Sequence, residues 1–222
     1  MSVDGQLRVA SRVVTALILV AAVVVFFGPS GLGNRTLRGV LAQWRAQAIV
    51  KREWLELAAI REGSTAGVVA ADGVVFFDYT CEYCRRIGAI VGGAVRRSDA
   101  ERLRIRYLTR SGDAPARLAA SLAVCSEHSG DFLTVHSRLM NTDLREVGTS
   151  IIDKIFEAGG IDRDAINRCL AHTSTEHRLS EDSTWSARLG IRGTPTFVSR
   201  RGRFYLGSDS TAIKRLLDEA VD

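Results

Sequence analysis

The chain has 222 residues, of which 46% are hydrophobic and 25% charged, a composition that suits one folded core of ordinary size with an insert and an appendage. The net charge of +5 is spread along the chain rather than gathered into basic tracts, which argues against nucleic-acid binding. The four cysteines fit either a redox protein in an oxidising compartment or a zinc site in a reducing one.

An uncharged apolar run at residues 13–27 follows Arg8 and Arg12, a pattern typical of a signal peptide or a signal anchor. The run is short for a membrane span, because about 20 residues cross the hydrocarbon core, although roughly 17 are tolerated. No Ala-x-Ala cleavage signature follows it. We therefore predict that residues 1–34 comprise a cytoplasmic tip, an uncleaved single-pass anchor and, at residues 28–34, a flexible joint. A cleaved signal is the alternative.

Residues 35–63 are predicted to form an N-terminal amphipathic helix that precedes the main domain, with helical composition throughout residues 35–62. One face of this helix carries Leu37, Leu41, Trp44 and Ala48. Because the stripe does not continue as a sustained heptad, a long coiled coil is not predicted. The helix either packs on its own domain, pairs with another protomer as a homo-oligomer, or lies on the membrane surface.

Strand signals begin beyond this helix. Residues 68–70 and 74–77 are short β-branched and aromatic runs, and Asp72-Gly73 between them is a turn signal of the kind that joins hairpin strands. A helix-like segment then extends to about Arg97. Residues 103–108 alternate as a half-exposed strand should. Strand, helix and strand in this order predict a βαβ unit with a parallel pair.

A Cys-x-x-Cys motif, Cys81 to Cys84, stands where the second strand passes into the helix. At a helix N-terminus, unpaired backbone N–H groups and the helix dipole favour a thiolate, so Cys81 is predicted to be the nucleophile. Cys84, one turn further and more buried, is placed to attack a mixed disulfide at Cys81 and release the product. A carboxylate at Glu82 opposes the thiolate, whereas Arg85 and Arg86 support it.

A helical block is predicted for residues 113–183, where strand signals are almost absent. Helical spacing is found at residues 115–125, 132–140, 150–158 and 164–170, with Asp162 as an N-cap. Strands return at residues 196–198 and 204–206, joined as a hairpin across Arg201-Gly202. Asp209 then caps a final helix that reaches Val221.

Taken together, a βαβ unit with Cys-x-x-Cys, a helical insert, and Gly193-Thr194-Pro195-Thr196 before a hairpin and a last helix resemble the thioredoxin fold. Residues 76–84, Phe-Phe-Asp-Tyr-Thr-Cys-Glu-Tyr-Cys, with the helical insert resemble the DsbA-like thiol:disulfide oxidoreductases of the bacterial cell envelope. The likeness covers residues 64–222 and implies an α/β fold in which the insert at about 113–183 interrupts a thioredoxin-like domain.

The resemblance implies that the Thr194-Pro195 peptide bond is cis and lies opposite the active cysteines, where the preceding backbone can pair with a bound polypeptide. A cis X-Pro bond belongs to a small minority, so one here signals a functional constraint; the alternative is an ordinary proline that opens a strand. Thr194, Pro195, Glu82 and Tyr83 are accordingly predicted to contact the substrate.

This sequence departs from the family at two places. Relatives often carry a buried acid six residues before the first cysteine, which helps to deprotonate the second; here that residue is Val75. Another base or water must then accept the proton of Cys84. Relatives also often have Pro, then His or Tyr, between the cysteines, where this chain has Glu82 and Tyr83.

The other two cysteines, Cys125 and Cys169, fall in separate helices of the insert. Some DsbA-like proteins join helices of the insert by a second, non-catalytic disulfide, and the resemblance implies such a bond here. Two buried free thiols are the alternative.

A metal site is the competing role for the cysteines, because Cys125 and His128 have Cys-x-x-His spacing and with Cys81 and Cys84 offer a Cys3His zinc set. Both pairs lie in helical segments rather than in tight knuckles, so no metal site is predicted. Three further histidines have polar neighbours and are expected to be exposed: His136, His172 and His177.

These observations predict a thiol:disulfide oxidoreductase that uses no cofactor, tethered to the cell inner membrane with its catalytic domain on the periplasmic side. Its partners would be client proteins with thiols and, by family resemblance, a membrane quinone-linked oxidase that reoxidises Cys81 and Cys84. An oxidase is the first hypothesis. An isomerase or reductase of the same fold is the second, since Thr194 before Pro195 resembles the isomerases, and a redox-inactive binding module is the third.

Overall fold

The computed structural model describes residues 15–21, 23, 32–61, 68–95, 103–109, 112–144, 150–156, 160–211 and 213. The chain divides into two compact units, Met1–Arg45 and Ala46–Asp222. The boundary between the two units falls inside helix α2 (Leu32–Arg52).

Of the predicted membrane anchor at residues 13–27, the structure describes residues 15–21 and 23, which are helical and exposed. Within the described part of the chain, no helix combines the length and the apolar character that a membrane crossing requires.

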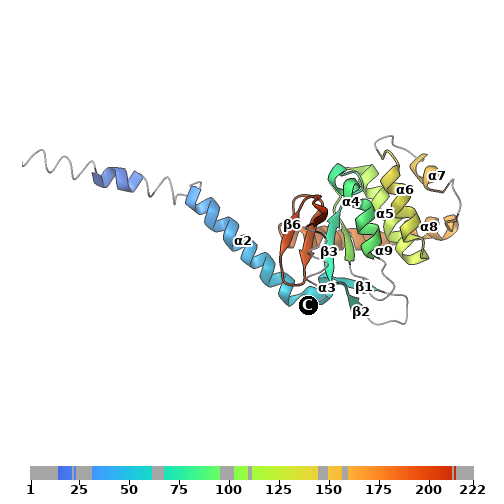
Figure 1. The fold of residues 1–222 in the computed structure, drawn as a ribbon, viewed down its shortest axis with the longest axis horizontal. Helices are drawn as coiled ribbons and strands as arrows, with labels where there is room; N and C mark the ends of the chain where they lie inside the picture. The colour runs from blue at the N-terminus through green and yellow to red at the C-terminus, as the bar shows by residue number, and fades with distance from the viewer. Residues whose placement is uncertain are drawn as a thin grey trace, which may run out of the picture. The chain divides into compact units, whose positions relative to one another are not determined.

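A four-stranded sheet in the order β4-β3-β5-β6 forms the centre of the main unit (Figure 1). The strands are β3 (Gly73–Phe77), β4 (Leu103–Tyr107), β5 (Thr196–Ser199) and β6 (Phe204–Leu206). The β3–β4 pair is parallel, whereas β3–β5 and β5–β6 are antiparallel. The predicted parallel βαβ unit and the C-terminal hairpin are therefore confirmed. Gly202 lets the hairpin turn, because its φ of 77° lies in the left-handed region that favours glycine.

All five residues of β3 are buried, because alternate side chains enter two different cores. Val75 and Phe77 pack in a large core with α4 (Glu82–Val95) and the insert helices. Val74 and Phe76 pack on the other face of the sheet with the C-terminal end of α2 and with α9. A strand covered on both faces has a continuous apolar sequence rather than an alternating one, which explains the run Val-Val-Phe-Phe.

The turn signal at Asp72-Gly73 does not join the two strands beside it as a hairpin. β2 (Val68–Ala70) pairs antiparallel with β1 (Ala59–Arg61) in a separate two-stranded sheet. β3 instead has β4 and β5 as its two neighbours. Because β3 is the strand whose side chains fill both cores, its pairing is decided by what covers it and not by the turn before it.

The single helix predicted over residues 35–62 is also wrong. Its regular part ends at Arg52, and a one-turn helix, α3 (Trp54–Leu57), follows before β1 begins. The buried side chains of Trp54 and Leu57 belong to the core under β3, so the chain bends at Glu53 to bring them there.

The insert is helical, as predicted (Figure 1). Its helices are α5 (Ala114–Ser129), α6 (Phe132–Asn141), α7 (Ser150–Phe156), α8 (Arg163–Leu170) and α9 (Thr173–Arg188). Asp162 caps α8 by accepting a hydrogen bond from the Ala165 N–H, as expected. The sequence pattern missed α9, because its buried face mixes polar and apolar residues and so lacks an apolar stripe. The buried residues of α9 are Thr175, Leu179, Asp182, Trp185 and Ser186.

Candidate active site

The turn between β3 and α4 places Cys81 directly before the first residue of the helix. The Asp78 carboxylate holds this turn, accepting hydrogen bonds from the Thr80 backbone N–H at 2.8 Å and the Thr80 hydroxyl at 2.7 Å. The Cys81 carbonyl accepts the first helical bond, from Arg85 N–H at 3.0 Å. Cys81 therefore lies at the helix N-terminus, the position that the sequence predicts.

The Thr194–Pro195 peptide bond is cis, as predicted. It leads into β5, the strand beside β3, and so approaches the cysteines although it lies far from them in the sequence. The Cys81 thiol donates a hydrogen bond to the Thr194 carbonyl at 3.3 Å. Cys81 is half-buried at this junction.

Cys84 lies behind Cys81 and is completely shielded, with 0% of its surface exposed. Burial raises the pKa of the Cys84 thiol well above its ordinary value, and the Asp78 N–H, which donates to the sulfur at 3.5 Å, opposes this only in part. Both thiols are free. The pair thus combines the half-buried Cys81 with the fully buried Cys84, an arrangement that suits thiol–disulfide exchange.

Val75, which occupies the position of the family's buried acid, is fully buried in apolar surroundings. The expectation that His136 is exposed is wrong, since only 3% of its surface is accessible. Its imidazole Nδ1 lies 2.9 Å from the Tyr79 hydroxyl and its Nε2 lies 2.9 Å from the Gly88 carbonyl. His172 and His177 are exposed, as expected. The signal that the sequence analysis overlooked was the spacing of Phe132, Val135, His136 and Leu139 on one face of α6.

Glu82 and Tyr83 between the cysteines are exposed, and 55% of the Tyr83 surface is accessible. Arg86 binds both: its guanidinium lies 2.5 Å from the Glu82 carboxylate and 5.4 Å from the centre of the Tyr83 ring. This pairing offsets the negative charge next to Cys81. Leu206 is 76% exposed and lies against Gly193, the residue before Thr194.

A cleft of about 330 Å³ opens beside the first turn of α4. It is lined by Thr80, Glu82, Arg85, Asn141, Asp143 and Leu144. Arg85 joins its two sides by donating to the Thr142 carbonyl at 3.0 Å. The cleft thus connects the cysteine turn with the end of α6.

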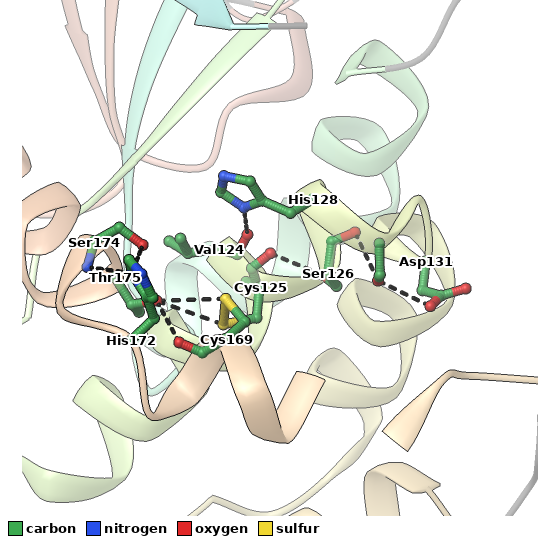
Figure 2. Close-up of a disulfide and its surroundings, with 11 residues drawn as sticks. Val124, Cys125, Ser126, His128, Asp131, Cys169, His172, Ser174 and Thr175 are labelled. Atoms are coloured by element: carbon green, nitrogen blue, oxygen red, sulfur yellow. Dashed lines mark hydrogen bonds between the residues drawn. A yellow bond between two sulfur atoms is a disulfide. The ribbon is translucent and has the colours of Figure 1, made fainter. Parts of the chain in front are cut away.

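A disulfide joins Cys125 of α5 to Cys169 of α8, with an S–S distance of 2.10 Å (Figure 2). The Thr175 hydroxyl from α9 lies 3.5 Å from the Cys125 sulfur and 3.4 Å from the Cys169 sulfur, and donates to the Cys169 carbonyl at 3.1 Å. The bond and its polar partner therefore hold three helices of the insert together.

Replacing both Cys125 and Cys169 by alanine is expected to lower the free energy of unfolding by about 4 kcal/mol, on the chain-entropy model for a loop of 44 residues. Denaturant unfolding followed by circular dichroism would measure the loss. The matched control replaces Cys81 and Cys84 instead, which leaves the insert bond intact. Equal stability of the two double variants would contradict a stabilising role.

A zinc site that uses Cys125 is incompatible with this structure, because its sulfur is bonded to Cys169. His128, the other half of the Cys-x-x-His pattern, has its Nδ1 2.9 Å from the Val124 carbonyl (Figure 2). In the described ranges, no group of three or more His, Cys, Asp or Glu residues is arranged to hold a metal ion.

The fold and these two cysteines together define a class of enzyme, the protein thiol:disulfide oxidoreductases. A family model described as Thioredoxin matches residues 62–219, most of the chain. The chain belongs to the thioredoxin family. The predicted resemblance to DsbA-like proteins, with a thioredoxin fold and a helical insert, is confirmed. A search of curated proteins finds no match.

Solved structures with the same fold include thiol–disulfide exchange proteins. The thiol-disulfide exchange protein alpha-DsbA2 from Wolbachia pipientis is 19% identical, with a TM-score of 0.62, covering 82% of this chain and 97% of its own. A linker-deletion mutant of ScsC from Proteus mirabilis is also 19% identical, with a TM-score of 0.62. The match covers 100% of this chain and 97% of the ScsC chain. A thioredoxin-like oxidoreductase from Silicibacter pomeroyi is 26% identical, with a TM-score of 0.53. The match covers 67% of this chain and 85% of the oxidoreductase chain.

Proposed function

We propose that this protein exchanges disulfides with extracytoplasmic client proteins through Cys81 and Cys84, acting as an oxidase. The observation that carries the proposal is the placement of the two sulfurs: Cys81 half-buried against the cis Thr194–Pro195 bond, and Cys84 sealed behind it. An exchange enzyme needs one sulfur that a client can reach and one that only its partner cysteine can reach.

In the oxidase direction, a client thiolate attacks the Cys81 sulfur of the oxidised pair. A client–Cys81 disulfide forms, the Cys81–Cys84 bond breaks, and Cys84 leaves as a thiolate that takes up a proton. A second client thiolate then attacks the client sulfur of the mixed disulfide, so the client gains a disulfide and Cys81 leaves as a thiolate. The Asp78 N–H, which contacts the Cys84 sulfur, favours the charged leaving group. A membrane redox partner, such as a quinone-linked oxidase, would then reoxidise the pair.

Client recognition would use the surface around Cys81. The cis Thr194–Pro195 bond leaves the Thr194 backbone beside the nucleophile, where an extended peptide can pair with it. Tyr83 adds an exposed aromatic ring, and Glu82, neutralised by Arg86, adds a polar contact. Backbone pairing would give affinity without strict sequence specificity, as an enzyme with many clients requires.

The compartment proposed is the periplasm or another extracytoplasmic space. A disulfide such as the one between the buried Cys125 and the half-buried Cys169 is typical of proteins from oxidising compartments. The apolar run at residues 13–27 would tether the chain to the inner membrane, with the catalytic domain outside the cytoplasm.

A disulfide isomerase is the second candidate, favoured by Thr194 before the cis proline and by an exposed apolar stripe on α2. The stripe comprises Leu37, Leu41 and Trp44, whose side chains are largely exposed. Exposed apolar residues at helical spacing suit pairing with a second protomer, and a homo-oligomer through residues 35–62 would hold two catalytic sites around one misfolded client.

The redox potential of the Cys81–Cys84 pair tests the direction of exchange. Equilibration of the protein in glutathione buffers, followed by thiol alkylation and mass spectrometry, is expected to give a value near −120 mV, as for DsbA. A value near −270 mV, as for thioredoxin, would reject the oxidase. Refolding assays on one client distinguish an oxidase from an isomerase. Reduced ribonuclease reports oxidation, and scrambled ribonuclease reports isomerisation.

A further inference from the structure

His136 is buried between two segments that flank the active cysteines. The Gly88 carbonyl can only accept a hydrogen bond, so Nε2 of the imidazole carries the proton and donates to it at 2.9 Å. Nδ1 is then unprotonated and accepts from the Tyr79 hydroxyl, also at 2.9 Å. The two partners thus select one tautomer of a neutral ring.

On one side, His136 binds the helix that carries Cys84. Gly88 lies one turn beyond Cys84 on the same face of α4. The helix approaches α6 so closely that a Cβ on Gly92 would lie 3.0 Å from His136 Cδ2, and one on Gly88 would lie 2.2 Å from Met140 Sδ. The ring therefore has little room to shift relative to the cysteine helix.

On the other side, His136 holds the segment that precedes Cys81. Tyr79 is buried, and its neighbour Asp78 donates its backbone N–H to the Cys84 sulfur. The His136 imidazole therefore links Tyr79, the residue after Asp78, to Gly88, one helical turn after Cys84. The bridge therefore spans the two segments that carry the Asp78 N–H and the Cys84 sulfur.

The bridge is uncharged, and direct proton transfer to it is unfavourable. Burial lowers the pKa of His136, whereas burial raises the pKa values of Tyr79 and Cys84. A thiol that holds its proton tightly does not protonate an imidazole that binds one weakly. Tyr107 from β4 stacks on Tyr79, its hydroxyl donates to Glu127, and its side chain also interacts with that of Tyr79, so the two tyrosines belong to one polar network.

We propose that His136, acting through Tyr79, is a positioning residue that keeps the Asp78 N–H directed at the Cys84 sulfur and so accelerates the steps in which Cys84 is a thiolate. Those steps are departure of Cys84 when a client attacks, and attack by Cys84 on a mixed disulfide. With Val75 in the place of an acid, this N–H is the first of two hydrogen-bonding groups that lower the pKa of Cys84, ahead of the Thr194 side chain. The proposal rests on the proposed exchange function.

The test separates chemistry at Cys84 from chemistry at Cys81. A mixed disulfide between Cys81 and a short cysteine peptide is prepared, and peptide release by Cys84 is followed by rapid quenching. Alkylation of Cys81 by iodoacetamide is measured in parallel on the reduced protein. For Tyr79→Phe and His136→Phe we expect release to slow by about tenfold, because a hydrogen bond to a charged group is misaligned, while alkylation changes less than about twofold.

Two further variants make the result specific. His136→Gln, whose amide offers one donor and one acceptor, is expected to recover part of the release rate. His128→Phe, the same substitution at a histidine of α5 whose Nδ1 contacts the Val124 carbonyl, is expected to leave the rate unchanged. Release at the wild-type rate in Tyr79→Phe, or equal slowing of release and alkylation, would overturn the positioning role. Failure of the wild-type mixed disulfide to release peptide at all would instead reject the proposed function.

Discussion

Replacement of Cys84 by serine is expected to trap client proteins on Cys81. The accessible sulfur still forms a mixed disulfide with a client, but the buried position no longer holds a thiol that can attack it. Complexes should therefore accumulate when reduced Cys84→Ser protein meets oxidised clients. Catalytic turnover should fall by at least about 10³-fold, since a serine hydroxyl cannot replace the thiolate in exchange.

Non-reducing electrophoresis and mass spectrometry of the trapped species measure this effect. Cys81→Ser is the matched control, because it removes the exposed sulfur from the same turn and leaves the buried one in place. It should form no complexes. Equal trapping by the two variants, or trapping through Cys125 or Cys169, would show that the accessible nucleophile has been assigned to the wrong residue.

Arg106→Met is expected to lower the free energy of unfolding by about 3 to 5 kcal/mol, the cost of leaving one partner of a buried ion pair uncompensated. Arg106 on β4 is 1% exposed. Its guanidinium lies 2.7 Å from the Asp182 carboxylate of α9, and it donates to the carbonyls of Leu57 and Glu56, at 2.8 Å each. One side chain thus joins the edge strand β4 to α9 and α3.

The expected loss of stability is large because Asp182 is fully buried and would lose its shortest ion pair, keeping only weaker contacts. Its carboxylate also accepts the Tyr107 N–H at 2.9 Å, and Arg178 lies 3.2 Å away. Burial raises the pKa of Asp182 to about 6, despite the opposing charge of Arg106. Without that charge, the aspartate is either a buried anion with less compensation or a buried neutral acid beside Arg178.

Chemical denaturation of Arg106→Met and of Arg117→Met would measure the difference. Arg117 forms an exposed ion pair with Glu176, and exposed pairs contribute about 0 to 1 kcal/mol. The same substitution at the two sites separates a buried network from a surface contact. A loss for Arg106→Met no larger than that for Arg117→Met would contradict the stabilising role of the network.

The sequence allowed more of the candidate site to be predicted than of the fold around it. Cys81 and Cys84 could be placed at a helix N-terminus because a strand, a motif of fixed spacing and a helix follow one another within a few residues. The cis proline came from resemblance, and its approach to Cys81 depends on two strands that are distant in the chain. His136 was assigned to solvent, because polar neighbours in sequence do not reveal that two glycines of α4 make space for its ring.

The pairing of β2 with β1, the bend at Glu53 and the polar helix α9 were missed for one reason. Periodicity reports which side of a segment is apolar, and it does not report which other segment will cover that side. The local order of residues therefore determined the redox motif, the parallel βαβ unit and the helical insert. The assignment of side chains to the two cores, the buried Arg106–Asp182 pair and the bridge through His136 arose only on folding, because each depends on contacts between residues far apart in the chain.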